Sequence, residues 1–118
     1  MDQRKSTHIK NIAVKNGKRV TLTAIEDIDW IEAADDYVIL HTGAQTHLHS
    51  ETMRNLENTL DPKSFLRIHR GAIVNLNRIK SIESDSSGEY NAVLTTGQKV
   101  KISRSRKKAL VNAFDSNA

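Results

Sequence analysis

Basic side chains interrupt a stretch that otherwise has the apolar composition of a protein core. The segment FLRIHRGAIVNLNRI, residues 65–79, sets Arg67, His69, Arg70 and Arg78 among leucine, isoleucine and valine. A guanidinium fork can bind phosphate oxygens, or O6 and N7 of guanine, through paired hydrogen bonds. These residue types therefore favour recognition of a polyanion, if the strands around them bring their charged ends to the surface.

A second basic run, SRSRKK, covers residues 103–108. Such a run is most often a solvated face. If Ser103 caps a terminal helix, however, its hydroxyl and the free backbone N–H groups of the first turn point outward beside Arg104 and Arg106. That arrangement is a ready phosphate site, to which Lys107 would add a further positive charge.

Three histidines fall on a predicted hairpin: His41 on its first arm, and His47 and His49 on its second. The spacing of His47 and His49 puts both on one side of a strand, so a zinc site is conceivable. No carboxylate or thiolate has a matching spacing, and polar residues are expected on the outer face of an antiparallel sheet. A solvated strand face is the favoured interpretation, and no metal or cofactor is predicted.

Acidic residues gather nearby, at Glu32, Asp35 and Asp36. Paired carboxylates could perform acid/base chemistry, but aspartate also tolerates the unusual dihedral angles of a turn between two strands. No positioned nucleophile accompanies them, and the spacing of His69 and Ser103 does not support a nucleophile with its base. A turn is favoured, and no enzymatic activity is predicted.

Composition narrows the partner further. The 118 residues include no cysteine, which excludes disulfides and thiolate zinc sites. The glycine motifs that bind nucleotide phosphates, GxGxxG and GxxxxGK[ST], do not occur, so nucleotide hydrolysis is not expected. Aromatic residues make up 4% of the chain, too few for a binder that stacks single-stranded bases on aromatic platforms. If the polyanion is a nucleic acid, duplex is the better expectation.

Charge is distributed unevenly along the chain. Residues 1–61 carry seven Lys and Arg against ten Asp and Glu, whereas residues 62–118 carry eleven against four. The basic surplus in the second half suggests one electropositive face. No apolar run long enough for a membrane span or a secretion signal is present, which predicts a cytoplasmic protein.

Periodicity predicts one mainly-β domain over residues 9–118, preceded by a disordered tail or linker at residues 1–8. A hairpin turns at Asn16-Gly17, a helical turn joins Ile25 to Ile28, and a second hairpin turns at Gly43-Ala44. A helix is predicted next, capped by Ser50 and stopped at Pro62, with Met53, Leu56 and Leu60 buried. A terminal helix is predicted from Ser103, with Ala109, Leu110 and Phe114 facing inward. Between the two helices, strands are predicted at 65–70, 72–75, 79–82, 89–95 and 99–103, with a loop at SDSSG.

From about Ile12 to Phe114 the chain resembles the LytTR family, the DNA-binding output domain of many bacterial response regulators. IEAADDYVILHT, FLRIHRGAIVNLNRIKSI and KVKISRSRKKAL carry the resemblance, in the family's order and approximate spacing. It implies an elongated arrangement of small antiparallel sheets with one or two short helices. It also implies sequence-specific binding to duplex DNA at promoters through loops, for a transcriptional regulator of a two-component system.

Carried onto this sequence, the resemblance places three points on DNA: Asp36 and Tyr37, then His69, Arg70 and Gly71, then Ser103, Arg104, Arg106 and Lys107. Leu66 and Ile68 would pack inward, and Gly71 would let the backbone bend and deliver Arg70 to a groove. Simple alternation puts His69 on the opposite face from Ile68, where it binds either phosphate or nearby backbone. Asp36 could accept from cytosine N4 or fix its loop, which makes Tyr37 the safer contact.

The family further implies that the DNA sites are direct repeats that hold two protomers, and that the protein is monomeric without DNA. It also implies a phospho-receiver domain, whose acidic pocket and lysine this chain does not contain. Two further residues of the basic stretch have other expected roles. Asn75 is expected to stabilise a turn, and Arg78 is expected either to bind a distant phosphate or to be solvated. The competing function is a non-catalytic protein-interaction module whose basic face binds an acidic partner.

Overall fold

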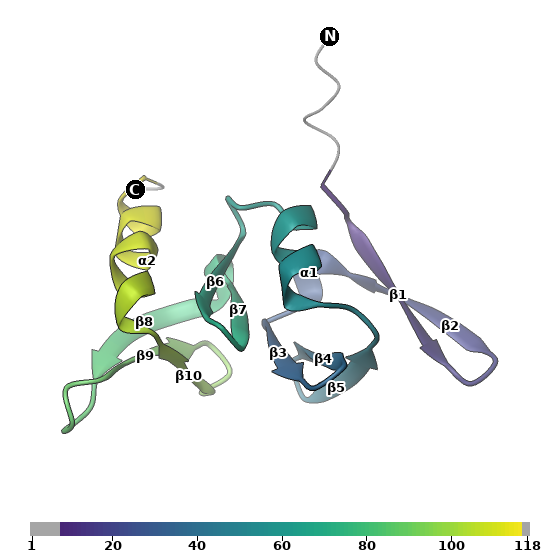
Figure 1. The fold of residues 1–118 in the computed structure, drawn as a ribbon, viewed down its shortest axis with the longest axis horizontal. Coiled ribbons are helices and arrows are strands. Elements are labelled where there is room, and N and C mark those ends of the chain that lie inside the picture. The colour runs from purple at the N-terminus through teal and green to yellow at the C-terminus, as the bar shows by residue number, and fades with distance from the viewer. Residues whose placement is uncertain (1–7, 117–118) are drawn as a thin grey trace, which may run out of the picture.

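Short strands joined by tight turns make up most of the structure, a computed structural model that describes residues 8–116 (Figure 1). The strands are β1 (Asn11–Asn16), β2 (Arg19–Ala24), β3 (Trp30–Ala34), β4 (Tyr37–Thr42), β5 (Gln45–His49), β6 (Phe65–His69), β7 (Ala72–Asn75), β8 (Ile79–Ser84), β9 (Tyr90–Leu94) and β10 (Lys99–Ile102). The helices are α1 (Met53–Thr59) and α2 (Arg104–Ser116), and single 3₁₀ turns cover Ile25–Asp27 and Leu76–Arg78. The tail predicted at residues 1–8 lies, apart from His8, outside the described residues.

The turns predicted from glycine and aspartate are confirmed. Gly17 between β1 and β2 has φ 65°, and Gly43 between β4 and β5 has φ 64°. Asp35, between β3 and β4, is the only non-glycine residue of the described chain with a positive φ, at 55°. A short polar side chain tolerates this left-handed conformation, so Asp35 closes the hairpin, as its turn chemistry predicts.

The strands form three antiparallel sheets that follow one another along the molecule (Figure 1). β1 and β2 make a separate ribbon, β5-β4-β3-β7-β6 make the central sheet, and β10-β9-β8 make the third. The predicted fold class is therefore confirmed. Strand β7 lies beside β3 inside the central sheet, so residues 42 positions apart in sequence, Ile31 and Ile73, are paired neighbours.

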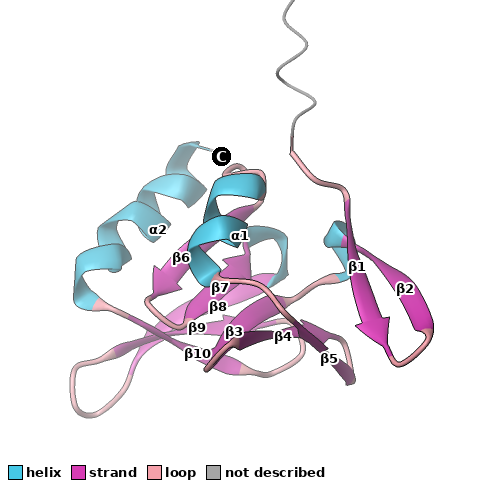
Figure 2. Cartoon of the chain, turned by 45° about the vertical axis from the view of Figure 1, so that its right-hand side comes forward, coloured by secondary structure: helices cyan, strands magenta, loops and turns pink. Residues whose placement is uncertain are grey.

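Two hydrophobic cores lie on the two faces of the central sheet. Figure 2 shows the strands and the two helices that surround them. The first core lies between that sheet and α1 with the β1–β2 ribbon, and it contains Ile12, Val14, Ile28, Ile31, Val38, Leu40, Met53, Leu56, Leu60, Phe65 and Ile73. The second lies between that sheet and β8–β10 with α2, and it contains Trp30, Ile68, Ala72, Val74, Leu76, Ala92, Leu94, Val100, Ile102 and Leu110. Alternate residues of β3 and β7 enter opposite cores because successive strand side chains point to opposite faces.

Helix α1 begins later than the sequence predicts, so the prediction of Ser50 as its cap is wrong. Thr52 has extended dihedrals, and its Oγ1 accepts a hydrogen bond from the backbone N–H of Asn55 at 3.0 Å. Glu51 accepts from the backbone of Thr52 at 3.0 Å and from the Asn55 amide at 2.7 Å, which keeps Glu51 outside the helix. The predicted buried stripe of Met53, Leu56 and Leu60 is confirmed.

Helix α2 presents Leu110 to the second core, where its side chain is fully buried. Ala113 and Phe114, three and four residues further on, pack against the same core with part of their surface exposed. Ala109 is exposed, so its predicted inward orientation is wrong. One residue corresponds to about 100° of helical rotation, which carries Ala109 away from the stripe that Leu110 begins.

A β-bulge in β6 changes which face its residues occupy. Arg67 pairs with Ile73 and His69 pairs with Ala72, so the register shifts at Ile68. Ile68 is fully buried, and Leu66 packs against the same core, which confirms that both point inward. Simple alternation put His69 on the face opposite Ile68. The extra residue instead brings His69 to the side of Ala72 and the second core, so that expectation is wrong.

The loop between β8 and β9 is organised by Asp85, as the serine- and glycine-rich sequence predicts. Its carboxylate accepts hydrogen bonds from the Ser87 hydroxyl and from the backbone N–H groups of Ser87 and Glu89. Because these bonds favour the charged form, above all the bond from the Ser87 hydroxyl, they hold the pKa of Asp85 below its usual range.

Asn75 joins the central sheet to the turn that follows it. Its side chain is buried, with the amide nitrogen donating to the carbonyl of Ile28 at 2.9 Å and the amide oxygen accepting from the backbone N–H of Asn77 at 3.0 Å. The predicted turn-stabilising role is confirmed, since the second of these bonds caps the 3₁₀ turn.

Asn75→Ala is expected to lower the free energy of unfolding by roughly 2 kcal/mol, because it leaves a buried carbonyl and an N–H group without their partners. The midpoint of urea denaturation should fall while the slope stays constant. Asn77→Ala is the matched control, since it keeps the backbone N–H and alters only an exposed side chain. Equal midpoints for the two variants would contradict the role of the buried side chain.

Candidate nucleic-acid interface

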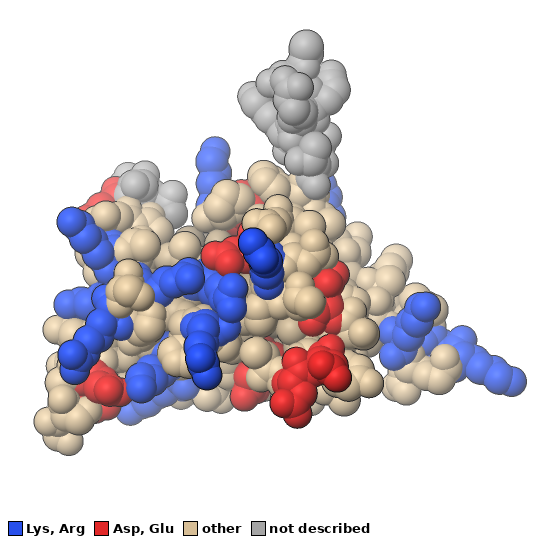
Figure 3. Space-filling model, in the orientation of Figure 1, with Lys and Arg blue, Asp and Glu red and all other residues tan. Residues whose placement is uncertain are grey.

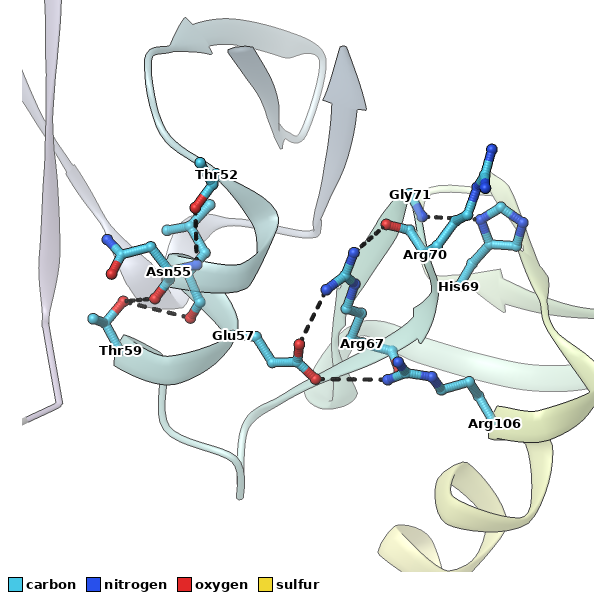
Figure 4. A network of polar contacts seen from close by, with 10 residues as sticks. Thr52, Asn55, Glu57, Thr59, Arg67, His69, Arg70, Gly71 and Arg106 are labelled. Carbon is cyan, nitrogen blue, oxygen red and sulfur yellow. Dashed lines mark hydrogen bonds and ion pairs between the residues drawn. The ribbon is translucent and has the colours of Figure 1, made fainter. Parts of the chain in front are cut away.

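The turn between β6 and β7 presents Arg70 on the surface. The side chain of Arg70 is exposed and points away from the neighbouring polar network (Figure 4). Its backbone carbonyl accepts from Arg67 Nη2 at 2.6 Å, and the next carbonyl, that of Gly71, accepts from the backbone N–H of Ala33 at 3.0 Å. The backbone of this turn is therefore fixed, whereas no bond between described residues engages the Arg70 guanidinium.

Gly71 does not have the conformation that requires glycine. Its φ lies outside the positive range, and a Cβ built on it would lie 3.5 Å from His69 Nδ1 and 3.8 Å from the Cβ of Ala33. These are ordinary van der Waals contacts, so the bend itself does not depend on glycine. Any need for glycine at this position would have to come from a partner that approaches the backbone closely.

His69 is hydrogen-bonded to local backbone, the structural alternative that its sequence position left open. The ring Nδ1 accepts from the backbone N–H of Gly71 at 3.1 Å. An accepting Nδ1 carries no hydrogen, so in the neutral ring the hydrogen is on Nε2, which is left to donate outward.

The start of α2 lies against the end of β6. The backbone N–H of Ser103 donates to the carbonyl of Ile68 at 2.8 Å. Ser103 occupies the position before the helix as predicted, but the contact that its hydroxyl makes is with the Ser105 hydroxyl, at 3.5 Å. Arg104 is exposed at the first helical residue. The predicted contact residues at the start of α2 are thereby brought beside those of the β6–β7 turn.

These two points share one surface hollow of about 370 Å³. Four predicted site residues line it, namely His69, Ser103, Arg104 and Lys107, together with Gly88, Glu89, Tyr90, Lys101 and Ile102. The Nζ atom of Lys107 lies 3.8 Å from the centroid of the Tyr90 ring, and Lys101 Nζ lies 3.0 Å from Glu89 Oε1. Sequence reasoning missed Tyr90 and Lys101, although the alternation of lysine with Val100 and Ile102 in KVKI was a signal for an outward-facing lysine.

Arg106 is engaged within the protein. Its Nη1 donates to the carbonyl of Arg67 at 3.1 Å and lies 3.6 Å from Glu57 Oε2 (Figure 4). Its predicted contact with DNA stays a prediction, but the guanidinium already holds α2 to β6. Arg78 is likewise engaged, with its Nε 3.3 Å from a carboxylate oxygen of the buried Asp29 and its Nη2 donating to the carbonyl of Glu26 at 3.0 Å.

The first predicted point, the tip between β3 and β4, adjoins the β6–β7 turn through the bond between Ala33 and Gly71. Asp36 and Tyr37 are both exposed. Tyr37 lines a different hollow, shared with β1 and β5, whose lining includes Lys15 and His47. The structure thus brings the tip near Arg70 but does not place Tyr37 in the hollow that His69 and Lys107 share.

The three histidines of the second hairpin do not share one face, although His47 and His49 do, as predicted. His47 pairs with Leu40, which enters the first core, whereas His41 on the other face stacks on Trp30 with ring centroids 4.3 Å apart. His41 Nε2 also lies 2.9 Å from Glu32 Oε1. Among residues 8–116, no group of three or more histidines and carboxylates lies close enough to hold a metal ion.

Charge is segregated on the surface. Figure 3 shows lysine and arginine gathered over α2 and the strands beside it, with acidic side chains grouped nearer the middle of the same face. A second, smaller group of lysine and arginine lies at the tip of the β1–β2 ribbon. Within residues 8–116, no helix has the length and apolar character needed to cross a membrane. The basic face suits a ligand that carries many negative charges.

Comparison with known proteins adds a family match and a common fold. A model of the LytTr DNA-binding domain matches residues 18–115. Sensory transduction protein LytT of Bacillus anthracis is 31% identical over 105 residues, which are 89% of this chain and 43% of that protein. Sensory transduction protein LytR of Staphylococcus epidermidis is 31% identical over 104 residues, 88% of this chain and 40% of that protein.

A solved LytTr DNA-binding domain from Bacillus cereus shares the fold, with a TM-score of 0.79 at 24% identity. The alignment covers 90% of this chain and 97% of that one. The chain spans less than half the length of the curated relatives described above.

Proposed function

Because this chain belongs to the LytTR family of DNA-binding domains, we propose that it binds duplex DNA with sequence specificity, as the output domain of a transcription regulator. The observation that carries the proposal is the convergence of His69, Ser103, Arg104 and Lys107 on one hollow in the basic face, beside the exposed Arg70. Side chains from β6 and α2, far apart in sequence, supply it with donors and positive charge.

The residues divide into those that read bases and those that position the backbone of the DNA. Arg70 and Arg104 are exposed at a turn and at a helix start, and each can take O6 and N7 of guanine. Lys107, Ser103 and the Nε2 hydrogen of His69 suit phosphate oxygens. Asp36 and Tyr37 contact the DNA flank from the neighbouring tip, and the Gly71 backbone approaches the DNA closely.

A gel-shift comparison of duplex, single-stranded DNA and structured RNA at fixed ionic strength tests the function. We expect preference for duplex and, after selection from a random pool, one recovered sequence bound at least about a thousandfold more tightly than random duplex. Equal binding of all three nucleic acids would remove the proposal. Binding to acidic proteins with no duplex preference would instead indicate a protein-interaction module.

We expect the recovered sites to be direct repeats spaced by about one helical turn, because one small module contacts too few base pairs to bind tightly alone. Footprinting at saturation should protect two half-sites on one face of the duplex, each by one protomer. A single short protected site would contradict this arrangement.

The chain without DNA should sediment as a monomer, and a tight dimer without DNA would show that pairing precedes binding. We also propose that a phospho-receiver domain accompanies this DNA-binding domain and controls the pairing of protomers on DNA. The naming of the relatives as sensory transduction proteins agrees with this proposal.

A further inference from the structure

One carboxylate joins two arginines from distant parts of the chain. Glu57 lies on the outer side of α1, with Oε1 3.1 Å from Arg67 Nη1 and Oε2 3.6 Å from Arg106 Nη1 (Figure 4). The first arginine belongs to β6 and the second to α2. Glu57 therefore connects three elements, although its own helix contributes none of the residues proposed to touch DNA.

Each arginine also donates to a backbone carbonyl of β6 or of the turn that follows it, which carries Arg70. Arg67 Nη2 donates to the carbonyl of Arg70 at 2.6 Å, and Arg106 Nη1 donates to the carbonyl of Arg67 at 3.1 Å. Arg67 Nε is buried without a hydrogen-bond partner among the described residues, so the guanidinium is oriented through its two Nη groups. Loss of the Glu57 contact would leave the Arg67 guanidinium oriented only by the bond from Nη2 to the Arg70 carbonyl.

We propose that Glu57 is a positioning residue, which sets the Arg70 turn and the start of α2 in register for DNA without contacting DNA itself. The inference rests on the proposed function and adds to it the source of the site's geometry. Glu57 is held by one charge-assisted hydrogen bond, from Arg67, and by one ion pair, with Arg106. These contacts restrict its orientation, and a binding site loses discrimination when its supporting side chains are free to move.

Coulomb attraction alone predicts the opposite outcome, which makes the proposal testable. Removing a negative charge from a basic face should tighten binding to every duplex. If Glu57 acts by positioning, its removal should weaken binding to the selected duplex instead. The Glu57 side chain is 40% exposed, so its ion pairs contribute little to the stability of the fold, and a loss of affinity would not reflect unfolding.

Glu57→Gln keeps the size of the side chain and removes its charge. We expect roughly three- to thirtyfold weaker binding to the duplex selected by the native chain, with random duplex bound as before or slightly more tightly. The logarithmic salt slope should stay the same, since no phosphate contact is lost, and the thermal midpoint should change little. Glu83→Gln is the matched control, because among the described residues its carboxylate contacts only the Ser81 hydroxyl.

A double-mutant cycle tests the route through Arg67. Arg67→Met removes the guanidinium and keeps most of the apolar stem, and Glu57→Gln added to it should weaken binding to the selected duplex little further. Additive losses, or a Glu57→Gln protein that binds the selected duplex as well as the native chain does, would overturn the positioning role while leaving the proposed function intact. If the native chain selects no duplex, the proposed function itself fails and the inference fails with it.

Discussion

Ile68→Asp is expected to leave the chain unfolded at 25 °C. Ile68 has no exposed surface, and it lies at the bulge of β6 in the core that contains Val74 and Leu110. A carboxylate at this position would lose its hydration and find no positive partner in the core, which costs several kcal/mol in a domain stabilised by about 5 to 15 kcal/mol in total. Circular dichroism should show loss of the β signal, and urea should produce no cooperative transition.

Ile68→Val is the control for this position, since it removes one methyl group and should cost about 0.5 to 1.5 kcal/mol. A native dichroism spectrum and a cooperative transition for Ile68→Asp would mean that the side chain can reach solvent, and the position of β6 between the two cores would be wrong.

Arg70→Ala and Arg104→Ala are each expected to weaken the selected duplex by about ten- to a hundredfold and random duplex much less. A bidentate contact with guanine contributes about 1 to 3 kcal/mol of discrimination, and this contribution exists only where the guanine is present. Both arginines are exposed, and no hydrogen bond or ion pair between described residues occupies either guanidinium, so alanine removes no packing that the fold needs.

Lys107→Met is the comparison within the same hollow. It keeps most of the aliphatic stem and removes the ammonium group that lies over the Tyr90 ring. Both duplexes should therefore weaken by similar factors, and the logarithmic salt slope should fall by about one. Titrations against selected and scrambled duplex at several salt concentrations separate the two roles. Equal losses on both duplexes for the arginine variants would assign Arg70 and Arg104 to phosphate, and base reading would move to Tyr37 and its loop.

Local sequence patterns were sufficient for the strands and turns. Alternation located the hairpins, and the tolerance of aspartate and asparagine for turn geometry located Asp35 and Asn75. These features depend on residues a few positions apart, so the sequence displays them directly.

The sequence failed where a local pattern allowed two outcomes. Ser50 and Thr52 are both good caps, and the bonds that Glu51 makes to Thr52 and Asn55 decide between them. Ala109 and Leu110 are adjacent on a helix, and only packing decides which faces inward. The bulge at Ile68 is set by pairing with β7, and it moved His69 to the other face.

The sequence predicted which residues form the candidate site better than it predicted the contacts that hold those residues in place. The resemblance named residues on three segments, and two of those segments meet in one hollow. No pattern indicated that Glu57 would lie between Arg67 and Arg106, because those residues are 10 and 49 positions away along the chain and meet only through the packing of α1 and α2 around β6.

The position of β7 between the two cores has a consequence for how the molecule opens. All four residues of this strand are buried, with Ile73 in one core and Val74 in the other. Neither half can unfold alone without exposing apolar surface that β7 shares with the other half, so partial opening is nearly as costly as complete unfolding. We therefore expect the amide hydrogens of β7 to exchange with deuterium only through global unfolding, so that their protection reports the stability of the whole domain.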